Sequence, residues 1–359
     1  MTVATHALSR RRGDRMVTVH TRSFGITARV HVRAVAVTTM LGTAALAVFV
    51  WSLTIGDFPI GLADVIATLR GTGTSEHEFI VRTLRLPRGL TGLAVGAAFG
   101  LSGAIFQRLA NNQLASPDII GVNAGAAVAA VFAIVVVHAS GPAVTAAALV
   151  GATVTAIATY LLAYRRGVTG YRLILVGIGV AAVLNALVQY FLTRAEIYDA
   201  QQAVVWLTGS LNGRSWDDLR PIAVTLAVVT PIVIVVARQL RALELGDDAA
   251  RGLGVRVERS RAMLLLAGVA LAAVATAAAG PIGFVALIAP QITRQLVGGR
   301  SLGLLPAAAG GALLVVAADL VARRIFAPTE LPVGVLTAVL GAPYLLSLIA
   351  RSSRGLTRG

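Results

Sequence analysis

The chain has 359 residues, of which 57% are hydrophobic and 13% are charged, and all 31 of its basic residues are arginine. A mean hydropathy of +0.81 excludes an ordinary soluble domain. Because lysine and cysteine are absent, the chain has no nucleotide-binding P-loop, no Schiff-base chemistry, no disulfide and no Cys-ligated metal. We expect no catalytic residue, metal site or cofactor.

The first 33 residues are polar and basic, and an apolar run of about twenty residues follows them, from Ala34 to Leu53. That run is longer than the core of a typical signal peptide. We therefore expect a retained first transmembrane helix, preceded by a basic cytoplasmic tail at residues 1–33. A start at Met16 instead of Met1 stays open.

Apolar runs of similar length recur along the rest of the chain. A helix of about 20 apolar residues covers the hydrocarbon core of a bilayer, whereas a β-barrel would show alternating segments of about ten residues. We expect an all-α, polytopic membrane protein with a ten-helix domain at 34–351 and a cytoplasmic tail at 352–359. The predicted spans are 34–53, 89–108, 119–138, 143–164, 172–193, 219–240, 262–280, 283–299, 302–322 and 332–350.

The arginines cluster at the ends of the apolar runs, as topology signals do. They form no basic stripe interleaved with aromatic residues, so we expect no nucleic-acid partner. With the N-terminal tail inside, 22 of the 31 arginines fall in cytoplasmic segments. We therefore expect a multi-pass protein of the plasma or inner membrane, embedded in lipid, with both termini in the cytoplasm.

The predicted spans contain almost no acidic residues, and Asp319 is the single acid within them. A proton-coupled carrier usually has buried acids or histidines along its route, which disfavours a secondary carrier. One span, 89–108, contains four glycines and permits close approach of neighbouring helices. The mid-span polar side chains are neutral and suited to interhelical hydrogen bonds: Gln107, Asn123, Asn185 and Gln189.

A charged loop at about 242–261 separates two apolar runs, on the cytoplasmic side by the arginine distribution. It contains Asp-Ala-Ala (248–250) with a glycine four residues beyond. This spacing predicts a short helix that ends at the glycine, because glycine permits the turn out of a helix. Such a helix either fits a groove on a partner or is a solvated linker. The candidate coupling residues are Asp247, Asp248, Ala249, Ala250, Arg251 and Gly254.

Several long motifs occur in an order that resembles one family. They are RLPR (85–88), GLSGAIFQRLANNQLASPDIIGVNAGA (100–126), GPIGFVALIAPQITR (280–294), ADLVAR (318–323) and ELPVGVLTAVLGAP (330–343). From about residue 40 to 350 the chain resembles the permeases of iron–siderophore and cobalamin (FecCD/BtuC-type) ABC importers. Three further stretches resemble the ferric-enterobactin permeases in particular: YRLILVGIGV (171–180), GSLNGRSW (209–216) and LELGDDAARGLGVRVERSR (243–261).

The resemblance implies the type II importer fold, with ten spans per permease. It implies four partners: a second permease subunit that is a paralogue, a dimer of ATP-binding subunits, an extracytoplasmic siderophore-binding protein and a ferric siderophore. The substrate implied is of the catecholate type, similar to enterobactin, and ATP is hydrolysed by the partner subunits. Uptake of haem or cobalamin is the alternative within the family.

Three arginines match the family positions that meet glutamates of the binding protein: Arg85, Arg88 and Arg323. Without the family they would be interfacial anchors whose charged ends reach the lipid headgroups. The Asp-Ala-Ala motif resembles the family's coupling loop, with Asp in place of Glu. In the family the loop between the fourth and fifth spans closes the path, where a plain turn is the alternative. The candidate gate residues in that loop are Thr169, Gly170 and Tyr171.

The chain departs from the family pattern at two places. It has Asn-Gln-Leu-Ala at 112–115 where the family has Asn-Pro-Leu-Ala, which removes a stiff point from the loop. It has Pro290-Gln291 where the family has Pro-His, so no protonation switch operates at Gln291.

Overall fold

The structure is a computed structural model that describes residues 16–21, 26–164, 170–243, 246–298 and 303–356. Ten of its helices match the ten predicted spans, which confirms a helical, polytopic membrane protein. Their bounds are α1 (Val32–Thr54), α4 (Leu86–Leu109), α5 (Val122–Val135), α6 (Pro142–Ala163), α7 (Gly170–Arg194), α9 (Trp216–Leu243), α11 (Val257–Ala279), α12 (Val285–Val297), α13 (Leu304–Arg324) and α14 (Val333–Leu356).

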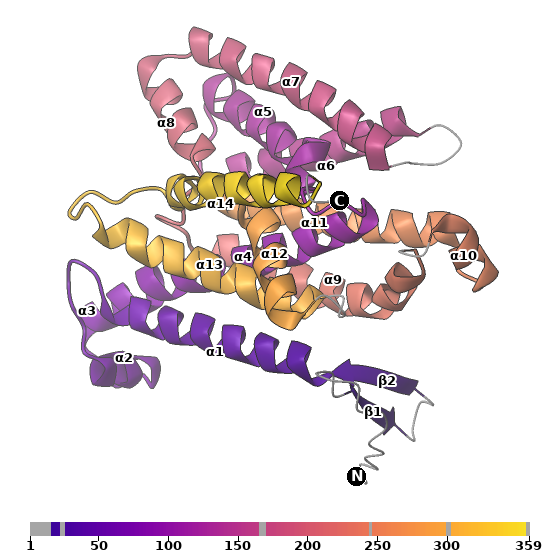
Figure 1. The fold of residues 1–359 in the computed structure, drawn as a ribbon. Coiled ribbons are helices and arrows are strands. Elements are labelled where there is room, and N and C mark those ends of the chain that lie inside the picture. The colour runs from indigo at the N-terminus through magenta and orange to yellow at the C-terminus, as the bar shows by residue number, and fades with distance from the viewer. Residues whose placement is uncertain (1–15, 22–25, 165–169, 244–245, 299–302, 357–359) are drawn as a thin grey trace.

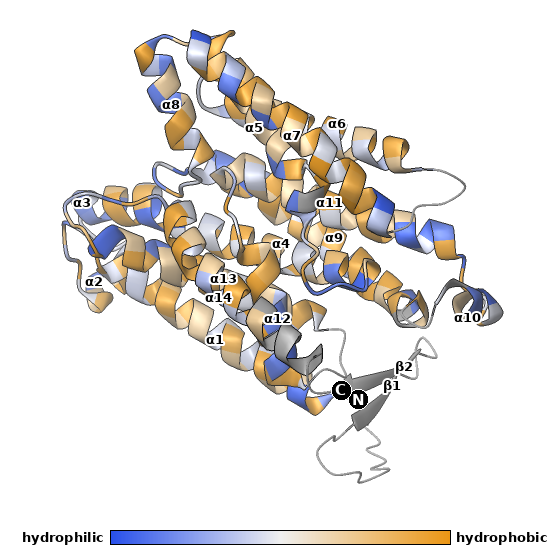
Figure 2. Cartoon of the chain, turned by 45° about the horizontal axis from the view of Figure 1, so that its top comes forward, coloured by the Kyte–Doolittle hydropathy of each residue, from blue (hydrophilic) through white to orange (hydrophobic). Residues whose placement is uncertain are grey.

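Within the described part of the chain, seven helical segments are long and apolar enough to cross a membrane. Three of the ten helices are not among these seven: α5 has 14 residues, α12 has 13, and the apolar part of α14 is limited to Val333–Leu348. Figure 2 shows hydrophobic residues along the lengths of the long helices, with hydrophilic residues at α3, at α10 and near several helix ends. This distribution is the one that a bilayer selects, because polar groups are costly within the hydrocarbon region.

Six short helical elements and a hairpin are present in addition to the ten membrane helices. The helical elements are α2 (Leu62–Leu69), α3 (Ser75–Glu78), the π-helix η1 (Phe79–Arg85), the 3₁₀-helix η2 (Pro117–Ile120), α8 (Ile197–Leu207) and α10 (Asp247–Gly252). Strands β1 (Met16–Thr21) and β2 (Ile26–His31) pair antiparallel, with Met16 opposite His31. The hairpin is absent from the sequence prediction, although both segments are rich in the β-branched residues that favour strands.

Helix α4 is the centre of the bundle and packs against α13, α11, α12 and α9. Its glycines allow backbone to meet backbone: a Cβ on Gly96 would lie 2.3 Å from the Gly311 carbonyl oxygen, and one on Gly103 would lie 1.7 Å from that of Ala286. A Cβ on Gly100 would lie 2.1 Å from the Ala307 carbonyl oxygen. The close helix packing predicted from these glycines is confirmed.

Polar side chains inside the bundle bridge helices. Ser102 of α4 donates to the carbonyl of Gly268 in α11 at 2.6 Å, and Gln107 donates to that of Leu287 in α12 at 3.0 Å. Asn123 of α5 accepts from the Thr276 hydroxyl at 2.6 Å. The predicted interhelical hydrogen bonds are therefore confirmed for Gln107 and Asn123. The other two polar residues, Asn185 and Gln189, are exposed on α7.

The bundle has two distinct ends (Figure 1). Helices α2 and α3 lie at one end and α10 lies at the other, towards which the hairpin of β1 and β2 also extends. We call the first the arginine end, because Arg88 lies there in the first turn of α4 and Arg323 in the last turn of α13. We call the second the α10 end.

Candidate functional site

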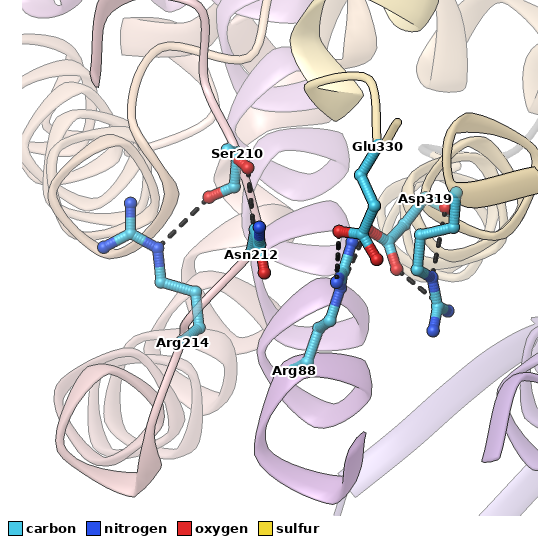
Figure 3. A network of polar contacts seen from close by, with 7 residues as sticks. Arg88, Ser210, Asn212, Arg214, Asp319 and Glu330 are labelled. Atoms are coloured by element: carbon cyan, nitrogen blue, oxygen red, sulfur yellow. Dashed lines mark hydrogen bonds and ion pairs between the residues drawn. The ribbon is translucent and has the colours of Figure 1, made fainter. Parts of the chain in front are cut away.

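A four-residue charge cluster lies at the arginine end, where α4 begins and α13 ends. The Nη2 of Arg88 lies 2.9 Å from Oδ1 of Asp319, and its Nη1 lies 2.9 Å from Oε2 of Glu330. The Nη2 of Arg323 lies 3.0 Å from Oδ2 of Asp319. Figure 3 shows Arg88 reaching up from α4 between the carboxylates of Asp319 and Glu330. One aspartate therefore serves two arginines, and one arginine is held by two acids.

Burial makes this cluster tightly held. The Asp319 side chain is 4% exposed, and those of Arg88 and Arg323 are 12% and 11% exposed. Charges shielded from water need partners, because an uncompensated buried charge is strongly destabilising. Two of the three predicted docking arginines thus already have an acidic partner within the chain.

The third predicted docking residue, Arg85, has a different set of partners. Its Nη1 donates to the carbonyl of Leu53 at 2.7 Å, and its Nη2 donates to the carbonyl of Phe58. These carbonyls belong to the end of α1 and the segment after it. A cation suits the C-terminal end of a helix, where carbonyls lack helical partners. Arg85 therefore fastens α1 to the start of α4, and the structure does not join it by a direct contact to the Arg88 cluster.

The local sequence explains how these arginines are presented. Pro87 has no N–H, so the carbonyl of Thr83 cannot be paired four residues on. The preceding turns widen into the π-helix η1, in which the N–H of Leu86 bonds to the carbonyl of Val81. In α13 the spacing of Asp319 and Arg323 is i,i+4, which places them on one face of the helix.

At the other end, α10 confirms the short helix that the sequence predicts. Gly254 follows it with φ of +78°, and its N–H bonds to the carbonyl of Arg251 at 2.9 Å. The N–H of Val255 bonds to the carbonyl of Ala250 at 3.0 Å. This pair of bonds is the Schellman motif, which favours glycine because the left-handed conformation is strained for residues with a Cβ.

The two alanines of the coupling motif differ in burial. Ala250 is fully buried, in a helix that contacts α9 and α11, whereas Ala249 is exposed. Leu253, just beyond the helix, is 65% exposed. The Arg251 guanidinium pairs with Asp248 at 3.0 Å. The side chain of Asp247, another candidate coupling residue, lies outside the described residues. The exposed side chains of α10 and of the residue after it are therefore Asp248, Ala249, Arg251 and Leu253.

The predicted gate is only partly visible. Thr169 lies outside the described residues, Gly170 begins α7, and Tyr171 is 79% exposed in the first turn of that helix. The structure brings this segment into no contact with the arginine cluster.

Sequence reasoning missed the two acids of the cluster, Asp319 and Glu330, although both stand in quoted motifs. The i,i+4 spacing of Asp319 and Arg323 was an available signal. It quoted the motif at 209–216 but assigned no role to its residues, among which Arg214 donates to the Ser210 carbonyl at 3.1 Å (Figure 3). Burial lowers the pKa of Arg214, and the nearby Asp218 partly offsets that effect.

A further buried acid lies between α4 and α5. The carboxylate of Asp118 in η2 accepts a hydrogen bond from the Asn123 amide, and burial raises the pKa of Asp118 to about 6. Nothing in the spacing of the residues signalled this burial. Among the described residues, no group of three or more His, Asp or Glu side chains could hold a metal ion.

The two departures from the family pattern meet in space. The side-chain amide of Gln291 in α12 donates to the backbone carbonyl of Gln113 at 2.5 Å. Gln291 is buried, so its amide needs this partner. Gln291 thus anchors the loop in which Gln113 occupies the position of the family's proline.

The family follows from the comparisons with known proteins. The sequence pattern of the FecCD transport family matches residues 44–351. The chain belongs to the FecCD transport family. As a FecCD permease it is the transport subunit of a multi-subunit system rather than an enzyme.

Individual relatives cover almost the whole chain. The ferric enterobactin transport system permease protein FepG of Escherichia coli (strain K12) is 43% identical over 315 residues, which span 88% of this chain and 96% of FepG. The iron(3+)-hydroxamate import system permease protein FhuG of Bacillus subtilis (strain 168) is 40% identical, over 85% of this chain and 94% of FhuG. A solved inward-facing metal-chelate type ABC transporter has a TM-score of 0.78 and 28% identity, over 88% of this chain and 99% of that one. Membership of this group implies ATPase and binding-protein partners.

Proposed function

We propose that this FecCD permease forms the membrane path of an ATP-driven importer of a ferric siderophore of the catecholate type. The observation that carries the proposal is the 43% identity to FepG along 96% of that protein's length. The similarity to FhuG, named for hydroxamate, supports siderophore import in general. The choice of a catecholate rests on FepG and on the motifs at 171–180, 209–216 and 243–261.

The arginine end faces the extracytoplasmic side and the α10 end faces the cytoplasm. The support is the arginine distribution, since 22 of the 31 arginines fall in segments that this orientation places inside. In this orientation the hairpin of β1 and β2 belongs to the cytoplasmic tail at residues 1–33.

Helix α10 couples the permease to its ATPase. Because the chain has no lysine, it has no P-loop, and the energy of ATP reaches it through contact with another subunit. On the exposed surface of α10, the small side chain of Ala249 lies between the larger ones of Asp248 and Leu253, which suits insertion into a cleft. Because α10 contacts α9 and α11, movement of the ATPase dimer would be transmitted directly to two transmembrane helices.

The path lies between this chain and a second permease, a paralogue, along α7. Asn185 and Gln189 are four residues apart on the exposed side of α7, in the middle of an apolar helix. Polar side chains at this depth usually face protein or a water-filled cavity. Gly170 and Tyr171 begin the same helix at its cytoplasmic end, where a gate with Thr169 would close the path.

The binding protein docks at the arginine end through Arg88 and Arg323. Arginine suits this role because its guanidinium binds carboxylates in a bidentate manner. Arg85, whose guanidinium is held by two backbone carbonyls, contributes positive charge rather than a free docking group.

Uptake in cells tests the proposed substrate class. The chain, expressed with the second permease, ATPase and binding protein of its system in cells lacking siderophore permeases, should import ⁵⁵Fe bound to a tris-catecholate. Import of ⁵⁵Fe bound to a tris-hydroxamate, haem or cobalamin should stay at background. Import of one of these instead would overturn the catecholate assignment. Uptake that persists in vanadate-treated proteoliposomes would overturn ATP-driven import and favour a secondary carrier.

A further inference from the structure

The two acids that hold Arg88 differ in position and accessibility. Asp319 belongs to α13, is 4% exposed and also holds Arg323. Glu330 is 34% exposed and belongs to the segment between α13 and α14. The acid on one edge of the Arg88 guanidinium is thus fixed in a helix, and the acid on the other edge is open to solvent (Figure 3).

Arg88 itself has little free surface. Its side chain is 12% exposed, because Asp319 takes Nε and Nη2 at 3.3 and 2.9 Å, and Glu330 takes Nη1 at 2.9 Å. A carboxylate from another protein cannot reach the Asp319 edge without disrupting α13. It can reach the other edge only where Glu330 now lies.

We infer that Glu330 is a built-in competitor for the docking site, and that the binding protein docks by exchanging its own carboxylate for Glu330 on Arg88. The inference rests on the proposed docking function. Asp319 is the positioning residue: it holds Arg88 and Arg323 in place throughout the exchange. The exchange replaces one ion pair by another, so Arg88 stays paired at both stages and the displaced Glu330 carboxylate is hydrated by solvent.

This arrangement favours reversible docking. Glu330 is partly open to solvent, where ion pairs are weak, so removing the competing carboxylate should tighten docking by roughly two- to fivefold. An unpaired arginine would instead bind the partner's carboxylate without competition and release it more slowly. Because exposed charges are screened by salt, the effect of Glu330 should shrink as ionic strength rises.

The test measures binding-protein affinity for the complete importer in nanodiscs, with the purified, ferric-siderophore-loaded binding protein of the same system as the probe. Glu330→Gln removes the competing charge and keeps the shape of the side chain. Asp217→Asn is the matched control, because Asp217 is an exposed acid at the same end of the bundle. It lies at the start of α9, where Trp216 donates a hydrogen bond to the carbonyl of Arg82 in η1. We expect Glu330→Gln to bind about two- to fivefold tighter at low salt, and Asp217→Asn to bind like wild type.

Each outcome separates the inference from the docking proposal. Arg88→Gln should weaken docking, and unchanged affinity in that variant would overturn the docking proposal itself. If Arg88→Gln weakens docking while Glu330→Gln leaves it unchanged or weakens it, only the competitor role is overturned. Equal tightening by Asp217→Asn would assign the effect to overall charge and would also overturn it.

Discussion

The two ends of this permease carry their candidate partner sites in opposite states. At the arginine end, Arg88 and Arg323 are mostly buried and bound by acids of their own chain. At the α10 end, Ala249 and Leu253 are exposed, and only Ala250 is turned inward. Charge is neutralised within the bundle at the first end, and at the second an alanine and a leucine are left open beside the exposed ion pair of Asp248 and Arg251.

The difference follows from the chemistry of each surface. Arginines at the end of a tightly packed bundle cannot remain unpaired, because desolvation without a partner costs several kcal/mol. An exposed alanine and leucine on a short helix cost far less. A docking site built from buried arginines therefore needs acids within the chain, whereas the exposed alanine and leucine of α10 need no partner.

The largest effect is expected from Asp319→Asn. It leaves Arg323 without its acid and Arg88 with Glu330 alone, and breaking a buried pair typically costs about 3–5 kcal/mol. We expect a clear loss of folded, monodisperse protein in detergent and a lower thermal midpoint. The measurement is fluorescence-detected size-exclusion chromatography across a temperature series.

The control for that variant replaces the charged core of the cluster as a whole. Arg88→Met, Asp319→Leu and Arg323→Met together leave no buried charge, and such apolar exchanges are often neutral for stability. The triple variant should regain folding and lose docking. A triple variant as unstable as Asp319→Asn would show that shape, rather than charge pairing, holds the cluster.

An intermediate effect is expected at α10, where two adjacent alanines form a matched pair. Ala249→Trp adds bulk to the exposed face and should reduce ATPase binding by about tenfold or more, with the fold intact. Ala250→Trp adds the same bulk to a buried position, where overpacking costs about 1–3 kcal/mol. That variant should lower the thermal midpoint of the permease alone.

The measurements are pull-down of the ATPase and the thermal midpoint of each variant. Wild-type ATPase binding and uptake in Ala249→Trp would reduce α10 to a solvated linker. A lowered midpoint in Ala249→Trp, similar to that of Ala250→Trp, would contradict the orientation of the helix.

The ten membrane helices could be predicted because length and hydropathy decide them. The close packing of α4 could be predicted from its glycines. Those at 96, 100 and 103 have no side chain, so the backbone of a neighbouring helix can approach them closely. The hairpin of β1 and β2 and the short helix α2 could not be predicted, because short segments carry weak local signals and depend on tertiary contacts. The residue that precedes the 13-residue α12 and caps it is Phe284, whose φ is +67°, a conformation that no residue pattern predicts.

The candidate site was predictable in position and not in partners. Arg88 and Arg323 were placed at helix ends by sequence, but Glu330 reaches Arg88 across 242 residues. The contact between Gln291 and Gln113 likewise spans 178 residues. Such pairs depend on how helices distant in sequence are placed side by side, which one sequence does not specify.

The smallest effect is expected when an exposed aspartate is neutralised at either end of the bundle. Measuring one such variant at each end compares the two ends directly. Asp248 pairs with Arg251 at 3.0 Å and Asp217 pairs with Arg220 at 3.2 Å, both on exposed surface with i,i+3 spacing. Neither Asp248→Asn nor Asp217→Asn should change the thermal midpoint, because exposed pairs contribute little. Rim charges act mainly on association rate, so Asp248→Asn should change ATPase association by about two- to threefold at low salt and not at high salt. Asp217→Asn should leave ATPase association unchanged, since its charge lies at the other end of the bundle. Stopped-flow association of labelled ATPase at two salt concentrations measures both variants, and an equal change in the two would show that net charge, rather than α10, governs the encounter.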